Sequence, residues 1–148
     1  IRGQLWYGED VANSFYVIKK FNNDKISVPV LTITELKLIR AESAAESNSN
    51  ISIAQQDIQD ILDRAYGVGN RIAPITPISL IQESRNQRRL EFIFEGRRGQ
   101  DLKRIGALGR ETVLIRNAPW NCPGSILQFP QSEIALSPGF IGNPEGGC

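Results

Sequence analysis

The stretch RRLEFIFEGRRGQDLKR, residues 88–104, decides the fold of this chain. Charged side chains of both signs alternate in it with apolar and aromatic ones, and Gly96 separates two charged turns. Glu91 and Glu95 are four residues apart, which places them on one face of a helix. A segment of this kind must satisfy several charges while it buries aromatic rings. The stretch therefore predicts a helix whose charges support its packing.

The helix that carries this stretch is predicted to start near Pro77 or Ser79 and to run to Glu95, where Gly96 breaks it. Proline suits the first turn of a helix, and Ser79 with the glutamine three residues later fits a capping box. A short helix over 100–105 is expected to follow.

An earlier helix is predicted from Thr34 to Ser47. Thr34 is expected to cap it, and Glu35 favours the positive end of the helix dipole. The buried face of this helix is predicted to carry Leu38, Ala41 and Ala45, with Ile39 beside them.

A helix between these two is the clearest element of the sequence. Ser52 and Gln55 fit a capping box at its start, and Gly67 is expected to end it in a left-handed conformation. Its apolar stripe follows the helical period: Ala54, Ile58, Ile61, Leu62 and Ala65. Its solvent side is predicted to carry Gln56, Asp57, Gln59, Asp60 and Asp63. Two amphipathic helices joined by a short polar turn indicate an antiparallel helical hairpin.

The chain is thus predicted to be mainly α, with residues 29–106 helical. Residues 1–28 form an irregular lead-in, in which 16–18 is a short strand or extended segment. Residues 107–148 form a loop-rich tail with little regular structure, because glycine and proline recur in it. The apolar side chains of the tail are expected to be buried against a scaffold: Ile126, Leu127, Phe129, Ile134, Leu136, Phe140 and Ile141.

Composition excludes several classes of protein. The 148 residues make one domain's worth of chain, with a net charge of +1 and no histidine. Two cysteines, Cys122 and Cys148, are too few for a zinc site, and the sequence leaves open whether they pair. No stretch approaches the length of a membrane helix. The chain begins at Ile1 and has no methionine, so we interpret it as the C-terminal part of a longer protein.

The charged residues are compatible with two kinds of chemistry. Glu91 and Glu95 are a candidate acid–base pair, but the alternative is that they bind arginines and fix helix packing. Arginines and lysines of this region are interleaved with carboxylates, whereas a nucleic-acid surface is more one-sided. We therefore predict no catalytic residue, no metal, no cofactor and no nucleic-acid partner.

Aromatic residues in irregular segments are the candidates for ligand contact. Trp6, Tyr7 and Trp120 lie in such segments. Rings in loops either stack on sugars or bases, or pin the loop to the body of the protein. We predict ligand binding by these three residues, with the pinning role as the alternative.

Several motifs resemble a known family in order and spacing. Residues 87–96 resemble the pattern Glu-Arg-Arg-x-Glu-Leu-x-x-Glu-Gly, and residues 98–106 resemble Arg-x-x-Asp-Leu-x-Arg-x-Gly. Residues 29–43, 129–134 and 143–144 match further motifs, so the likeness covers about Pro29 to Cys148. The family is that of the SusD/RagB outer-membrane nutrient-binding lipoproteins, in their C-terminal region. The resemblance gives a structural role to Arg88, Glu91, Glu95, Gly96, Arg98, Asp101 and Arg104.

This resemblance implies tetratricopeptide-like helical hairpins with long ordered loops. It also implies non-catalytic binding of a glycan or peptide at the cell outer membrane, and delivery to a SusC-like TonB-dependent transporter. The lipid anchor would lie on an N-terminal segment absent from this chain. Gln87 replaces the first glutamate of the signature, which predicts the loss of a buried ion pair. The alternative function is a helical-repeat scaffold that binds only protein.

Overall fold

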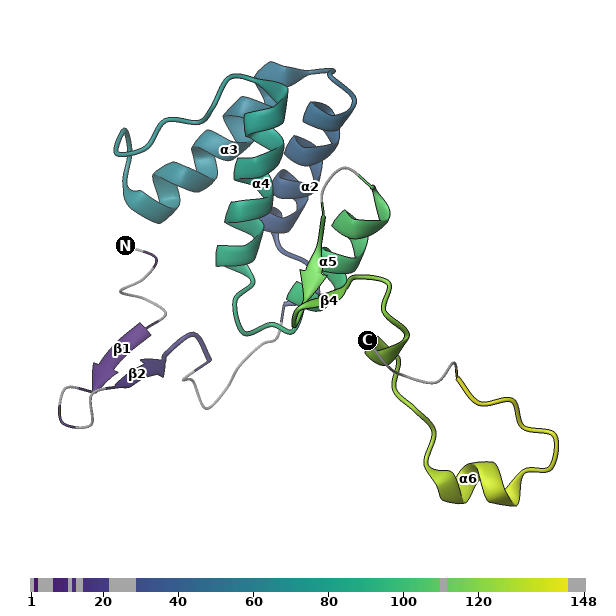
Figure 1. Ribbon diagram of the computed structural model, residues 1–148. Coiled ribbons are helices and arrows are strands. Elements are labelled where there is room, and N and C mark those ends of the chain that lie inside the picture. Colours follow the sequence, from purple (N-terminus) through teal and green to yellow (C-terminus); the bar gives the residue numbers. More distant parts are fainter. Residues whose placement is uncertain are drawn as a thin grey trace. The chain divides into compact units, whose positions relative to one another are not determined.

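A computed structural model describes residues 2, 7–10, 12, 15–21, 29–109 and 112–143. The chain forms two compact units, Ile1–Glu91 and Phe92–Cys148. Figure 1 shows the helices and strands of both units.

The first unit contains a short hairpin and three helices. Strands β1 (Tyr7–Asp10) and β2 (Phe15–Ile18) pair antiparallel, with Tyr7 opposite Ile18. The extended segment predicted at 16–18 is therefore confirmed as part of a strand. The helices are α2 (Ile33–Glu46), α3 (Ile51–Tyr66) and α4 (Pro77–Glu91).

The core of this unit lies between the three helices, with α2 packed against both α3 and α4 (Figure 1). The apolar stripe predicted for α3 is buried in full, as are Leu38, Ala41 and Ala45 of α2 and Leu80 of α4. The pairing of α2 with α3 confirms the predicted helical hairpin. Ile39, expected beside the buried face of α2, is instead 47% exposed, because one residue turns it about 100° away from Leu38.

The helix caps differ from the prediction at three places. Thr32, not Thr34, caps α2, since its hydroxyl accepts a hydrogen bond of 3.1 Å from the backbone N–H of Glu35. The chain enters α3 through Asn50 in a left-handed conformation without a side-chain cap, so Ser52 lies inside the helix. At α4 the hydroxyl of Thr76 accepts from the N–H of Ser79, which places Ser79 inside the first turn.

One residue predicted on the solvent side of α3 is buried. Asp57 is 2% exposed and accepts two hydrogen bonds from Arg40 of α2, at Nε and Nη2, both of 2.7 Å. The bidentate pair satisfies the carboxylate and joins the two helices of the hairpin. The polar side chain therefore belongs to the helix interface.

Helix α4 ends at Glu91, four residues before the predicted end at Glu95. The next residues form a turn in which Phe94 has φ +67° and Gly96 has φ +72°. A positive φ is incompatible with a right-handed helix, so the helix cannot continue through Phe94. Gly67 ends α3 as predicted, but its backbone, with φ +95° and ψ +146°, lies outside the left-handed helical region that was expected.

The second unit contains more regular structure than the sequence predicted. Helix α5 (Arg98–Ala107) is longer than the expected 100–105 and is followed by the hairpin β3 (Leu114–Ile115) and β4 (Ala118–Pro119). A 3₁₀ turn, η1 (Pro123–Ser125), and a short helix, α6 (Gln131–Leu136), complete it. The tail is thus not a purely irregular segment.

The apolar side chains of the tail are not buried as expected. Leu127 and Ile141 are each 91% exposed, and Ile134 is half-buried. Phe129 and Phe140 cover each other instead, with ring centroids 4.8 Å apart at an angle of 86°. The prediction of a buried tail is therefore wrong within this chain. The prediction of a mainly helical protein with a tetratricopeptide-like hairpin is confirmed.

Candidate functional site

The charged residues of α4 are used in helix packing. The carboxylate of Glu91 is buried and lies 2.6 Å from Arg2 and 2.8 Å from Arg64 of α3. Arg88 lies 3.2 Å from the buried Glu35 of α2. These ion pairs join α4 to both helices of the hairpin.

A second cluster extends the same connection along α4. The guanidinium of Arg85 lies 2.8 Å from Glu42 and 3.0 Å from Glu46, both on α2. Next to Arg85, the buried hydroxyl of Ser84 donates a hydrogen bond to the carbonyl of Leu38, which lies one turn before Glu42 on α2. Buried charges need partners of this kind, so the charges of α4 and α2 specify how the two helices meet.

Gln87 joins this network through hydrogen bonds of its side-chain amide. It is fully buried, accepts a bond of 2.7 Å from Arg2, and donates one of 2.7 Å to Glu83. Both ends of the amide are therefore satisfied, which is the condition for burying it.

The candidate acid–base pair does not form on one helix face. Glu91 is at the last position of α4, whereas Glu95 follows in the turn, 3.4 Å from Arg97. The two carboxylates therefore do not share a helix face.

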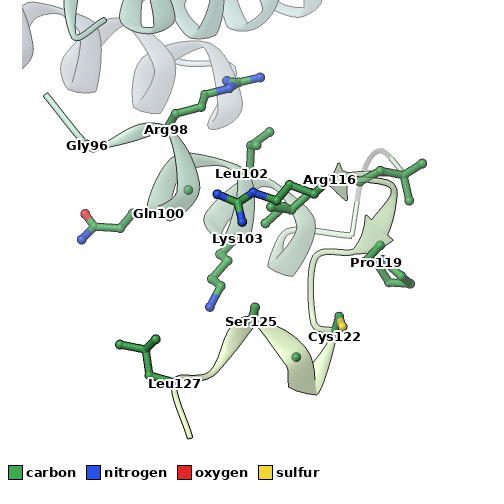
Figure 2. Close-up of a pocket in the computed structure, with 15 residues that line it drawn as sticks. Gly96, Arg98, Gln100, Leu102, Lys103, Arg116, Pro119, Cys122, Ser125 and Leu127 are labelled. Carbon is green, nitrogen blue, oxygen red and sulfur yellow. The ribbon is translucent and has the colours of Figure 1, made fainter. Parts of the chain in front are cut away.

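A hollow of about 930 Å³ lies in the second unit, between α5, the β3–β4 hairpin and the segment around η1. Figure 2 shows its lining. Its charged lining residues within the described ranges are all basic: Arg98, Lys103 and Arg116. Gln100 and Ser125 add polar groups, and the remaining lining is largely apolar, including Leu102, Pro119 and Leu127. A concave, partly apolar surface with a few polar groups is the usual form of a ligand site.

The residues expected to bind ligand are placed as follows. Trp6 lies outside the described residues. Tyr7 is the first residue of β1, and the structure describes its backbone only. Trp120 is half-buried and packs on α5, where a Cβ added to Gly106 would lie 2.2 Å from its Cγ. Trp120 does not line the hollow.

The seven motif residues fall on three neighbouring segments. Arg88 and Glu91 lie on α4, Glu95 and Gly96 in the turn after it, and the rest on α5. On α5, Asp101 is buried, whereas Arg98 and Arg104 are exposed. Arg98 also lines the hollow. The sequence alone does not indicate Lys103 or Arg116 as ligand residues, because nothing in the local sequence shows that they face one hollow.

Two further observations bear on the kind of site. Among the described residues no group of three or more His, Cys, Asp or Glu side chains is arranged to hold a metal ion. No helix in the part of the chain that the structure describes is long and apolar enough to cross a membrane. Cys122 is disulfide-bonded, and Cys148 lies outside the described residues.

The helical hairpin, with the third helix joined to it by buried ion pairs, defines a mainly helical protein of the helical-repeat type. A model of the SusD family matches residues 11–144, and the chain belongs to this family. No curated protein and no solved structure gives a significant match. The SusD family consists of non-catalytic surface lipoproteins of the outer membrane that bind glycans or other nutrients and work with SusC-like transporters.

Proposed function

We propose that this chain is the C-terminal region of a cell-surface receptor that binds a glycan, or a peptide, and passes it to a SusC-like TonB-dependent transporter. The observation that carries the proposal is the family match over residues 11–144. In this proposal an N-terminal segment outside this chain bears the lipid anchor, and the transporter is the protein partner.

The arrangement of the charged residues supports binding without catalysis. Glu91 is enclosed by Arg2 and Arg64, and Glu95 is next to Arg97, so each carboxylate is already engaged by arginine. Acid–base catalysis of glycoside hydrolysis needs two carboxylates facing one bond. Among the residues that the structure describes, the hollow of the second unit is lined by no carboxylate. It is therefore the candidate ligand site of a binding protein.

The disulfide supports a location outside the cytosol. Disulfides persist in oxidising compartments and on cell surfaces, whereas cytosolic thiols are kept reduced. The bond at Cys122 fits a surface-exposed lipoprotein.

The alternative of a scaffold that binds only protein is favoured by one observation. Leu127, Leu136 and Ile141 of the tail are between 79% and 91% exposed. Exposed apolar groups of this kind are common where another protein docks.

The proposal is tested by measuring the binding of the full chain to an array of soluble glycans. A hydrolysis assay then follows on every glycan that binds. We expect binding without turnover. Trp6→Ala together with Trp120→Ala tests whether these aromatic rings add ligand contacts to those of the hollow, which Trp120 does not line. The melting temperature of the variant separates lost contact from lost folding, because Trp120 also packs on Gly106. Absence of any glycan binding with retained protein partners would favour the scaffold, and turnover would identify an enzyme.

A further inference from the structure

We propose that the hollow of the second unit recognises a negatively charged group on the ligand, namely a carboxylate or a sulfate carried by an acidic sugar. This inference rests on the proposed function, because it names the ligand class of the same site.

The first support is the charge of the hollow. Lys103 and Arg116 both line it, both are exposed, and no carboxylate of the described residues lines it with them. Neither forms an ion pair with any residue of the described ranges. Cations elsewhere in the described chain are mostly paired with carboxylates, as Arg2, Arg40, Arg64, Arg85 and Arg88 show. Two cations that have no carboxylate partner among the described residues create a local positive potential in the concavity, which attracts an anion.

The second support is the direction of the two side chains. In Figure 2 the Arg116 side chain extends from the β3–β4 turn toward α5, and Lys103 extends from α5 toward the segment near Ser125. Arg98 points away from both. The guanidinium presents a planar fork that matches a carboxylate or a sulfate, and the ammonium adds a point charge. The two cationic groups thus reach the same hollow from different elements.

The third support is the backbone at Arg116. Arg116 and Asn117 form the two-residue turn between β3 and β4, with φ +52° and +67°. Positive φ at both positions is the type I′ turn, which favours asparagine and glycine. An arginine is unfavourable there, and strained residues of this kind gather at binding sites. The turn directs a long cationic side chain over the hollow, which asparagine or glycine would not supply.

The fourth support is the rest of the lining. Gln100 and Ser125 offer hydrogen bonds to hydroxyl groups, and Leu102 and Pro119 offer apolar contact to the faces of sugar rings. The volume of about 930 Å³ lies within the range of roughly 300–1,000 Å³ that is usual for ligand sites. The hollow therefore suits an oligosaccharide that carries an acidic group.

Isothermal titration calorimetry of the full chain with three oligosaccharides of equal length tests the inference. The probes are an oligogalacturonate with carboxylates, a sulfated galactan oligomer and a neutral galactan oligomer. We expect at least one acidic probe to bind more tightly than the neutral one, with an affinity that falls as salt is raised. The acidic probe that binds more tightly distinguishes carboxylate from sulfate as the group recognised.

Two substitutions remove the charges while keeping the fold. Lys103→Gln and Arg116→Asn are each expected to weaken binding of the acidic probe about fivefold, as for an exposed charge pair. The double variant is expected to weaken it roughly 25-fold if the effects add. Asparagine tolerates positive φ, so Arg116→Asn is expected to keep or raise the melting temperature. Arg89→Gln is the matched control, since Arg89 is exposed on α4 and does not line the hollow.

The outcomes separate this inference from the proposed function. Equal affinity of the double variant and the unchanged chain for an acidic probe would overturn the inference. Tighter binding of the neutral probe would overturn it too, while the receptor function would stand. Binding to none of the three probes, with no glycan bound on the array, would overturn both.

Discussion

Arg88 and Arg89 are neighbours on α4 with different surroundings. Arg88 lies 3.2 Å from Glu35, whose side chain is 8% exposed, whereas Arg89 is exposed. Removing one partner of a buried ion pair leaves a charge in a poorly solvated place. We expect Arg88→Ala to lower the free energy of unfolding by about 3 kcal/mol, and Arg89→Ala to change it by less than about 0.5 kcal/mol. Urea denaturation of both variants measures the difference, and equal effects would contradict the packing role of Arg88.

Two glycines of α5 offer a second comparison at this scale. A Cβ on Gly106 would lie 2.2 Å from Trp120, whereas a Cβ on Gly99 would meet no described atom within 4 Å. Gly106→Ala must therefore displace the indole, and we expect a loss of about 1–3 kcal/mol. Gly99→Ala is expected to stabilise the helix by about 0.5–1 kcal/mol, because alanine loses less backbone entropy. Thermal unfolding of both variants shows whether each substitution raises or lowers stability. Stabilisation by Gly106→Ala would contradict the close approach of Trp120 to Gly106.

At the scale of elements, the start of α2 is a point where the structure and the local sequence differ. Two threonines stand two residues apart, and only Thr32 accepts a bond from the first turn. We expect Thr32→Ala to cost about 1 kcal/mol, the usual value for loss of an N-cap. Thr34→Ala is the control, with an expected cost well below that. Chemical denaturation measures both variants. A larger loss of stability for Thr34→Ala than for Thr32→Ala would contradict the assignment of the cap to Thr32.

The link between α2 and α3 has a pH dependence. A hydrogen bond from Lys37 lowers the pKa of Asp60 below its usual value, and a second from Gln56 lowers it further. Because the pKa in the folded state is the lower one, this contribution is present above the unfolded-state pKa and is lost as pH falls through the folded-state pKa. We expect Lys37→Met to raise the pKa of Asp60 toward its usual value, with Lys37→Arg as the control. NMR titration of the Asp60 carboxyl carbon measures it, and an unchanged pKa in Lys37→Met would contradict the assigned cause.

The elements differ in how far the sequence predicts them. The stripe from Ala54 to Ala65 was predicted residue by residue, because a long helix repeats its period several times. The capping residues are not predicted correctly, because several serines and threonines stand near each helix start. Backbone geometry decides which of them caps the helix. The prediction that Asp57 is exposed is wrong. A carboxylate is usually exposed, and the burial of Asp57 depends on two hydrogen bonds from Arg40, which belongs to another helix.

At the scale of the whole molecule, the family and the mainly helical fold were predicted from motifs, whereas the hollow was not. Its lining runs from Gly96 to Leu127 and is brought together by β3 and β4, strands of two residues each. Strands this short carry no periodicity. Their turn, Arg116-Asn117, also lacks the glycine that usually marks such a hairpin. The site therefore depends on tertiary contacts that no local pattern encodes.

The central claim is that the protein acts as a receptor together with a transporter. Affinity purification of the full-length protein from solubilised outer membranes, with bound proteins identified by mass spectrometry, tests it most directly. We predict that a SusC-like TonB-dependent transporter co-purifies with it. Recovery of the protein from the cytosol, with no transporter bound, would contradict the account and leave the protein-binding scaffold in its place.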